Sequence, residues 1–133
     1  MIEEKRKMLA DYIRGSVAPI LIDFLNGENI PNSVLLDASC SIEDLNGHYS
    51  ETNFVPPIWM SKILNEKEPT ILVINRIDSI SKKEQKKFIE ILKYRKVSTF
   101  ELPKNTVIIL TAKEINNDTI DEEVYSLVAH IIG

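Results

Sequence analysis

Three apolar runs that show no alternation between apolar and polar positions organise the chain. They cover residues 33–38, 70–75 and 106–111, and turn-forming residues bound each of them. A strand that is apolar on both faces is typical of a parallel sheet covered on both sides. The pattern therefore predicts three buried parallel strands.

Helical spacing of apolar residues separates these runs. It predicts helices over residues 57–65 and 81–94, a helical turn at 121–127 and, after it, a last short strand at 128–132. Two helices are predicted before the first strand. One covers residues 3–14, and the other has Pro19 in its first turn and ends before Gly27, with its apolar face formed by Ile20, Leu21, Phe24 and Leu25.

Strands that alternate with helices predict the α/β class, with a three-layer α-β-α arrangement around a mainly parallel sheet. A chain of 133 residues forms one ordinary domain. We expect N-terminal helices in residues 1–32 and the sheet core in residues 33–132.

Composition narrows the setting of this domain. Hydrophobic residues make up 44% and charged residues 27%, the balance of a folded globular chain. Cys40 is the single cysteine, and the first residues do not have the pattern of a signal segment, so we expect a reducing, cytoplasmic location. No apolar run approaches the roughly 18 to 20 residues that cross a bilayer, which predicts no membrane partner.

The formal charge of −4 is distributed unevenly. Residues 82–96 hold seven Lys or Arg against two Glu, a local charge of +5, which leaves −9 on the rest of the chain. A basic helix on an acidic body predicts a contact with an anion or a nucleic acid, although a solvated helix face is the simpler interpretation. The candidate contact residues are Lys82, Lys83, Lys86, Lys87, Lys93, Arg95 and Lys96.

Several short motifs occur between the strands in a recognisable order. A Glu43-Asp44-Leu45-Asn46-Gly47 turn follows the first strand, a Phe54-Val55-Pro56-Pro57 turn precedes a helix, and the second strand ends in Asn75-Arg76-Ile77-Asp78. This order resembles the core of the AAA+ ATPases, in particular the MoxR-like and McrB-like branch. The similarity covers about residues 33–132 and implies a truncated P-loop NTPase-like core without a lid domain.

The residues that give this family its chemistry are missing. No Gly-x-x-x-x-Gly-Lys-Ser/Thr loop occurs to cradle phosphates, and Gly15-Ser16, before the second predicted helix, is the nearest remnant. Asn75 and Arg76 stand where the family has an Asp for magnesium and a Glu that polarises water, and Asp78 falls two places too late. An uncharged amide is a poor magnesium ligand, and arginine cannot act as a base.

Two further positions of the family pattern are also lost. The sensing asparagine is replaced by Lys113 or by Thr111, and Leu127 stands about where an arginine finger would be. Together these losses predict a protein that is not an enzyme, a pseudo-ATPase without a bound cofactor.

Other catalytic or metal chemistry has little basis. The two histidines, His48 and His130, lack the spacing to Cys40 that a zinc site needs, and a lone cysteine at a strand end is more often a packed residue than a nucleophile. Asp37, Glu43 and Asp44 could form a carboxylate cluster at a strand end, but such residues more often cap the next helix or turn, a task to which Ser41 and Asp44 are suited. We expect no metal.

Apolar residues offer the other candidate surface. The segment 54–59 is dense in large apolar side chains, and Phe54 and Trp59 are candidates for a partner surface, with burial of Trp59 in the core as the favoured alternative.

Three functions remain open. The first is a non-catalytic AAA+-like module for protein interaction or assembly, alone or beside an active ATPase. The second is a nucleic-acid-associated protein that binds through the basic helix, and the third is a divergent ATP-binding domain completed by a partner chain.

Overall fold

The computed structural model describes Lys7 and residues 18–30, 33–64, 70–97 and 100–131. These residues form an α/β fold around a five-stranded sheet in which every pairing is parallel. The α/β class and the parallel sheet are confirmed. In the described residues, no helix has the length and apolar character needed to cross a membrane.

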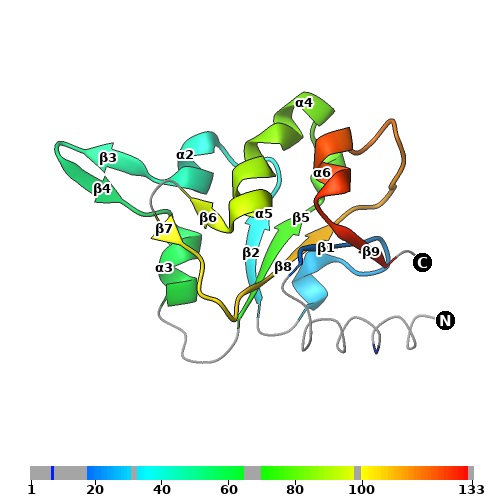
Figure 1. Ribbon diagram of the computed structural model, residues 1–133, viewed down its shortest axis with the longest axis horizontal. Helices are drawn as coiled ribbons and strands as arrows, with labels where there is room; N and C mark the ends of the chain where they lie inside the picture. The colour runs from blue at the N-terminus through cyan, green and yellow to red at the C-terminus, as the bar shows by residue number, and fades with distance from the viewer. Residues whose placement is uncertain (1–6, 8–17, 31–32, 65–69, 98–99, 132–133) are drawn as a thin grey trace.

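The strand order across the sheet is β2-β5-β8-β1-β9 (Figure 1). The strands are β1 (Ile20–Ile22), β2 (Ser33–Asp37), β5 (Ile71–Asn75), β8 (Val107–Thr111) and β9 (Ala129–Ile131). Their carboxyl ends are aligned, because Asp37 pairs with Asn75 and Ile22 pairs with Thr111. Residues at these ends therefore lie in one row along one border of the sheet.

Helices cover one face of the sheet, where the larger core cluster lies. They are α2 (Ile42–Asn46), α3 (Ile58–Leu64), α4 (Lys82–Gln85), α5 (Ile89–Tyr94) and α6 (Glu122–Ser126), with the 3₁₀ turn η3 (Lys86–Phe88) between α4 and α5. Trp59, Phe88 and Val124 are buried here against apolar strand residues. Each Å² of apolar surface removed from water stabilises the fold by about 25 cal/mol, so this packing is the main source of its stability.

The other face of the sheet carries a smaller apolar cluster, which includes Ile20, Val73 and Ile109. Among the described residues, the segment after β1 covers it, with the 3₁₀ turn η1 (Gly27–Asn29) and the buried Ile30. This connection runs from β1 to β2, opposite in direction to the other three connections. If all crossovers are right-handed, connections that run in opposite directions along the sheet must cover opposite faces. This explains why the β1–β2 connection lies on the face opposite the helices.

Two small hairpins complete the fold. The first pairs β3 (His48–Ser50) with β4 (Asn53–Val55), and the second pairs β6 (Lys96–Val97) with β7 (Phe100–Glu101). The first extends away from the sheet on the side of β2 (Figure 1). The first hairpin was not predicted.

The predicted helix over residues 20–25 is wrong, because Ile20–Ile22 is the strand β1, buried between β8 and β9. Only three residues long, β1 is an apolar run that periodicity cannot assign, and Phe24 and Leu25 complete a helical spacing by chance. The sheet core therefore begins before residue 33. The helix expected over residues 3–14 falls almost entirely outside the described residues.

The remaining elements agree closely with the predictions. Helix 57–65 corresponds to α3, and helix 81–94 to α4, η3 and α5, with Ser81 as the N-cap that accepts a hydrogen bond from Glu84 N at 3.2 Å. The strand at 33–38 is confirmed as β2. However, it lies at the edge of the sheet, and Leu35 is 42% exposed, so it is not the fully buried strand that its composition predicted.

Candidate functional site

The strand order has a switch point between the carboxyl ends of β1 and β8. The chain leaves β1 toward β2 and leaves β8 toward β9, so the two connections diverge in opposite directions along the sheet. Open α/β sheets bind ligands at such switch points. Asn75, at the end of β5, and Thr111, at the end of β8, were predicted from the sequence as degenerate site residues, and both lie at this border.

Hydrogen bonds within the chain occupy the polar groups of these residues. Asn75 Oδ1 accepts from Gly27 N at 3.1 Å and from Thr111 Oγ1 at 2.8 Å. The Thr111 hydroxyl accepts in turn from Arg76 N at 2.9 Å. Asn75 and Thr111 are both buried, so each of these bonds satisfies a group that would be costly to leave unpaired.

Gly27 approaches the sheet closely because it has no side chain. A Cβ at this position would lie 2.7 Å from Asn75 Oδ1, 2.7 Å from Leu35 Cδ1 and 2.8 Å from Val73 Cγ1. The segment after β1 thus packs directly on the sheet beside Asn75. The remnant expected at Gly15-Ser16 rested on a helix at 20–25, which is absent, and both residues lie outside the described part of the chain.

Asp78 joins the loops that follow β5 and β8. Its Oδ1 accepts from Arg76 Nε at 3.1 Å, and its Oδ2 accepts from the backbone N of Lys113 at 3.0 Å and of Glu114 at 3.1 Å. Arg76 has φ 60 and ψ 58, a left-handed conformation that is uncommon for a residue other than glycine. We call Gly27, Asn75, Arg76, Asp78, Thr111 and Lys113 the strand-end network.

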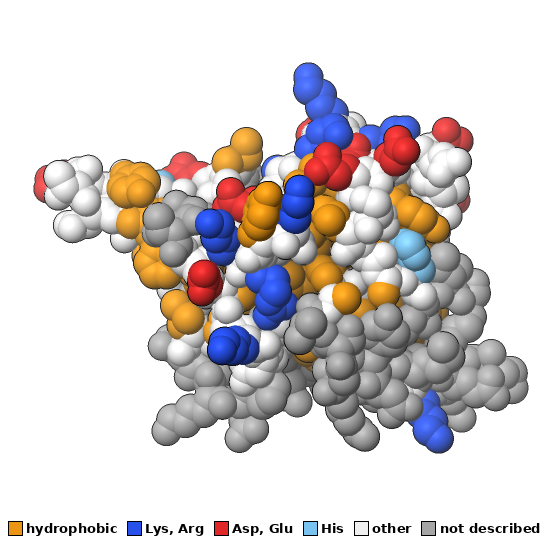
Figure 2. All heavy atoms as spheres, in the orientation of Figure 1, with side chains coloured by type: hydrophobic (Ala, Val, Ile, Leu, Met, Phe, Trp, Pro, Cys, Tyr) orange, Lys and Arg blue, Asp and Glu red, His pale blue; other side chains and the backbone are white. Residues whose placement is uncertain are grey.

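The basic helix has a different environment. Figure 2 shows Lys and Arg side chains interspersed with carboxylates on the face that carries α4 and α5. Lys82 Nζ donates to Asn117 O at 2.9 Å, and Lys86 pairs with Asp121 at 3.1 Å. Lys87 Nζ donates to Cys40 O. Intramolecular contacts therefore engage three of the six candidate lysines.

Arg95 is also engaged by the chain itself. It is half-buried, and one guanidinium nitrogen donates to Pro103 O at 2.9 Å and to Thr106 O at 2.7 Å. Burial lowers the pKa of Arg95, yet an arginine stays charged at any physiological pH. Of the candidate cations, Lys83, Lys93 and Lys96 are exposed, and their side chains make no hydrogen bond or ion pair with another described residue. The Tyr94 ring, 60% exposed, lies beside Lys93.

Asp121 helps to hold the loop before α6. It caps that helix by accepting from Val124 N at 3.2 Å, and its own N donates to the buried Gln85 Oε1 at 2.7 Å. Burial by itself would raise the pKa of Asp121, but the hydrogen bonds from Lys86 and the backbone outweigh it and lower this pKa. The Lys86 ammonium therefore has a local structural partner.

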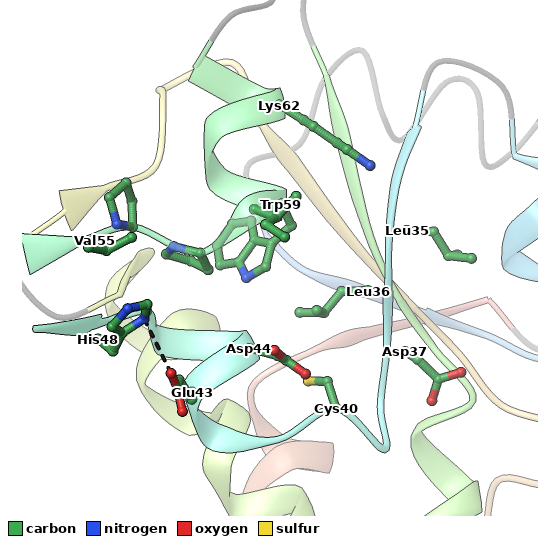
Figure 3. A pocket seen from close by; sticks show the side chains of 14 residues that line it. Leu35, Leu36, Asp37, Cys40, Glu43, Asp44, His48, Val55, Trp59 and Lys62 are labelled. Carbon is green, nitrogen blue, oxygen red and sulfur yellow. Dashed lines mark ion pairs between the residues drawn. The ribbon is translucent and has the colours of Figure 1, made fainter. Parts of the chain in front are cut away.

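A groove lies beside the edge strand β2, with a volume of about 620 Å³. The carboxyl half of β2 forms one side, residues 55–59 and Lys62 form another, and α2 and His48 border it (Figure 3). We call it the edge groove. It was not predicted as a unit, although Asp37, Glu43 and Asp44, the acidic residues singled out from the sequence, are among the residues that line it.

The predicted partner surface of Phe54 and Trp59 is corrected for Trp59. This side chain is 4% exposed, and its Nε1 donates to Leu45 O at 3.0 Å, so it belongs to the core, as the alternative proposed. Phe54 is half-buried and stacks on Phe100 with ring centroids 5.0 Å apart. This stacking partly covers the Phe100 ring. Tyr94, at the end of the basic helix, is therefore more exposed than Phe100.

Three exposed large apolar side chains, those of Leu35, Val55 and Ile58, line the edge groove instead. Of the eight such residues that the structure describes, six lie on β2, α2, the first hairpin or α3. They are Leu35, Ile42, Tyr49, Val55, Ile58 and Leu64. Ile58 is 78% exposed, although it directly precedes the buried Trp59. Sequence patterns missed this surface because exposure on a short helix depends on what the rest of the fold covers.

The remaining candidates have ordinary local partners. His48 Nδ1 lies 3.3 Å from Glu43 Oε1, and His130 stacks on Tyr125. Burial raises the pKa of the Cys40 thiol, which disfavours the reactive thiolate. Ser41 caps α2 by accepting from Asp44 N at 3.0 Å. Within the described residues, no group of three or more His, Cys, Asp or Glu could hold a metal ion.

Comparisons of the chain with models of known protein families and with curated proteins find no match.

Proposed function

We propose that this chain is a non-catalytic, AAA+-like domain that works as a protein-interaction or assembly module. The observation that carries the proposal is the state of Asn75. It stands where the AAA+ resemblance expects a magnesium-binding carboxylate, and its side-chain oxygen accepts hydrogen bonds from Gly27 and Thr111 instead. Because this amide oxygen is occupied by hydrogen bonds within the chain, it is poorly placed to bind a metal ion for hydrolysis.

The segment that follows β1 supports the same proposal. In a P-loop NTPase this is the position of the phosphate-binding loop, which needs a lysine and a magnesium-binding hydroxyl. Residues 23–29 read Asp-Phe-Leu-Asn-Gly-Glu-Asn and contain neither a lysine nor a hydroxyl side chain. Their carboxylates would repel a phosphate. The surface around the edge groove is the complementary support, because clustered exposed apolar side chains are typical of a binding surface.

The first test is a thermal-shift titration with ATP and magnesium, with light scattering to measure the mass at each protein concentration. A ligand present at 100 times its Kd stabilises a fold by about 2.7 kcal/mol. For a domain of this size, such a gain raises Tm by roughly 5 to 15 °C. We expect no ATP-dependent rise at any concentration, including those at which copies associate. A rise that grows with ATP would favour the divergent ATP-binding domain and overturn the proposal.

The nucleic-acid alternative can be tested by the salt dependence of binding. Only the side chains of Lys83, Lys93 and Lys96 make no hydrogen bond or ion pair with another described residue, so a DNA complex through this helix would release few counterions. Three phosphate contacts predict a slope of log K against log salt of about −2.7. Titration of a labelled 20-base-pair duplex between low and physiological salt measures it. A slope near −6 would show that all seven candidate cations bind phosphates.

A further inference from the structure

The edge of the sheet at β2 is open within the described part of the chain. Among these residues β2 pairs with β5 alone. Just after β2, Ala38 N donates to Asn75 O, so the backbone groups of residue 38 point toward β5. Alternate residues of a strand direct their N–H and C=O groups to opposite sides. The N–H and C=O of Leu35 therefore face the open edge.

The edge groove places apolar side chains next to these backbone groups. Leu35 is 42% exposed on β2, with its side chain on the face of the sheet that Gly27 approaches, whereas Val55 (37% exposed) and Ile58 (78% exposed) lie on the side of the groove formed by residues 55–59. Figure 3 shows β2 and the start of α3 on the two sides of the hollow. An occupant can thus bond to a strand edge and bury apolar groups at the same time, which is the combination used in peptide recognition by strand addition.

The charges around the groove select among occupants. Asp37, Glu43 and Asp44 line its border near the carboxyl end of β2, against Lys62 as the one lining lysine among the described residues. Hydrogen bonds from the Ser39 hydroxyl and backbone hold the pKa of Asp37 below its usual value, so this carboxylate stays charged at neutral pH. The surplus of negative charge favours a basic residue in the occupant.

We propose that the edge groove binds an extended segment of a partner protein, which adds as a strand beside β2. Its side chains alternate between the two faces of the sheet, so apolar ones contact Leu35 on one face and Val55 and Ile58 on the other, and a Lys or Arg lies near Asp37. This inference rests on the proposed function, because it names the site and the partner chemistry of the interaction module. Because α3 borders the groove, the space beside β2 suits a single added strand from a partner. A second copy would have to bring its own α3, packed on its β2, into the same space.

The experiment starts with a random peptide library selected on the folded chain. We expect enriched peptides in which neighbouring positions are apolar, so that both faces carry apolar side chains, and a Lys or Arg recurs at one end. The best peptide is then made synthetically and titrated by calorimetry against the wild type and against Leu35→Pro. Proline removes the outward N–H of Leu35 without touching a bond to β5, a position where edge strands tolerate it. We expect affinity to fall about tenfold, because the one hydrogen bond donated by the Leu35 N–H is lost and its acceptor on the peptide is left unpaired.

Two controls separate strand addition from other effects. Leu35→Val keeps both the N–H and an apolar side chain, and should stay within about threefold of the wild-type affinity. The second control leaves the protein unchanged, so it holds even if the proline variant fails to fold. The peptide is N-methylated at alternate residues in two sets, and only the set whose N–H groups face β2 should lose binding.

Three results would overturn the inference. They are a selection without enriched peptides, a peptide that binds equally well in both methylated forms, and a dimer by light scattering that Leu35→Pro dissociates, which would make a second copy the occupant. None of these results requires ATP binding. Conversely, a Tm that rises with ATP would remove the proposed function and leave the peptide titration as an independent result.

Discussion

The strand-end network and the edge groove lie at two borders of the same sheet and differ in how the chain treats its polar and apolar groups. At the strand ends, Asn75, Thr111 and Asp78 bond to other parts of the chain. At the edge groove, Leu35 and Ile58 expose apolar surface to solvent. The border where such sheets usually bind ligands is closed by internal bonds, and the border that a parallel sheet normally hides is open. This difference indicates that a binding surface should be sought at the edge groove beside β2 and not at the strand ends.

The largest expected effect contrasts two isoleucines on α3. Ile63 is 1% exposed and packs in the core, whereas Ile58 is 78% exposed beside the edge groove. Ile63→Ala should lower the free energy of unfolding by about 2–5 kcal/mol. Ile58→Ala should change it by less than about 0.5 kcal/mol. Urea denaturation measures both, and a large loss for Ile58→Ala would mean that this exposed side chain serves the fold and not a partner.

Gly27 tests how tightly the strand-end network is closed. The Cβ of Gly27→Ala would meet Val73 and Asn75, which are buried and cannot move aside as the half-exposed Leu35 can. We expect a loss of about 3 kcal/mol, the upper end for an overpacked site. The matched control is Glu28→Ala, an exposed position in the same turn. Equal Tm values for the two variants would contradict the close packing of this segment on the sheet.

Thr111 tests the hydrogen bonds of the network at constant volume. Thr111→Val removes the hydroxyl that donates to Asn75 and accepts from Arg76 N, and we expect a loss of about 1–2 kcal/mol. Thr106→Val is the control just before the start of β8, where the buried hydroxyl lies 3.4 Å from the Thr70 hydroxyl. Its loss by urea denaturation should be smaller. If the control loses more, the network contributes little.

The smallest effect concerns the acidic side of the edge groove. The pKa of Asp37 lies below its ordinary value of 3.8, first because of the hydrogen bond from the Ser39 hydroxyl. The unfolded chain then binds this proton more readily than the folded one. The stability that Asp37 contributes is present above pH 3.8 and is lost as the pH falls through the folded pKa. In Ser39→Ala, the Asp37 pKa should rise toward 3.8, as measured by NMR titration of the carboxyl carbon. An unchanged midpoint would mean that the hydroxyl bond has no such effect.

The parts of the fold that could be predicted are those whose signals are local. The apolar runs at β5 and β8 are long enough to identify as buried strands, and Ser81 marks the start of the basic helix. The family resemblance led to Asn75, Arg76, Asp78 and Thr111, which the fold does bring together at the strand ends. That these residues bond to one another could not be predicted, because the contacts join segments 35 or more residues apart.

Other features had weak or misleading local signals. The short β1 shares its apolar residues with a helical pattern, and only pairing on both sides makes it a strand. Residues 48–55 are largely polar and gave no strand pattern, yet they form the first hairpin. The lysines of the basic helix have the same charge in the sequence, but Lys82, Lys86 and Lys87 meet their partners in loops that are distant along the chain.

The sequence by itself determined the α/β class, the main buried strands and the absence of a Gly-x-x-x-x-Gly-Lys-Ser/Thr loop, because apolar periodicity and residue identity act over a few neighbouring positions. Only the tertiary structure decided that Asn75 bonds to Gly27 and Thr111, that Trp59 is buried while Ile58 is exposed, and that β2 is an edge strand. These outcomes depend on which strands become neighbours and what covers them. The order of the strands and the segments that cover them are set by packing over the whole sheet, and no single segment of sequence contains this information.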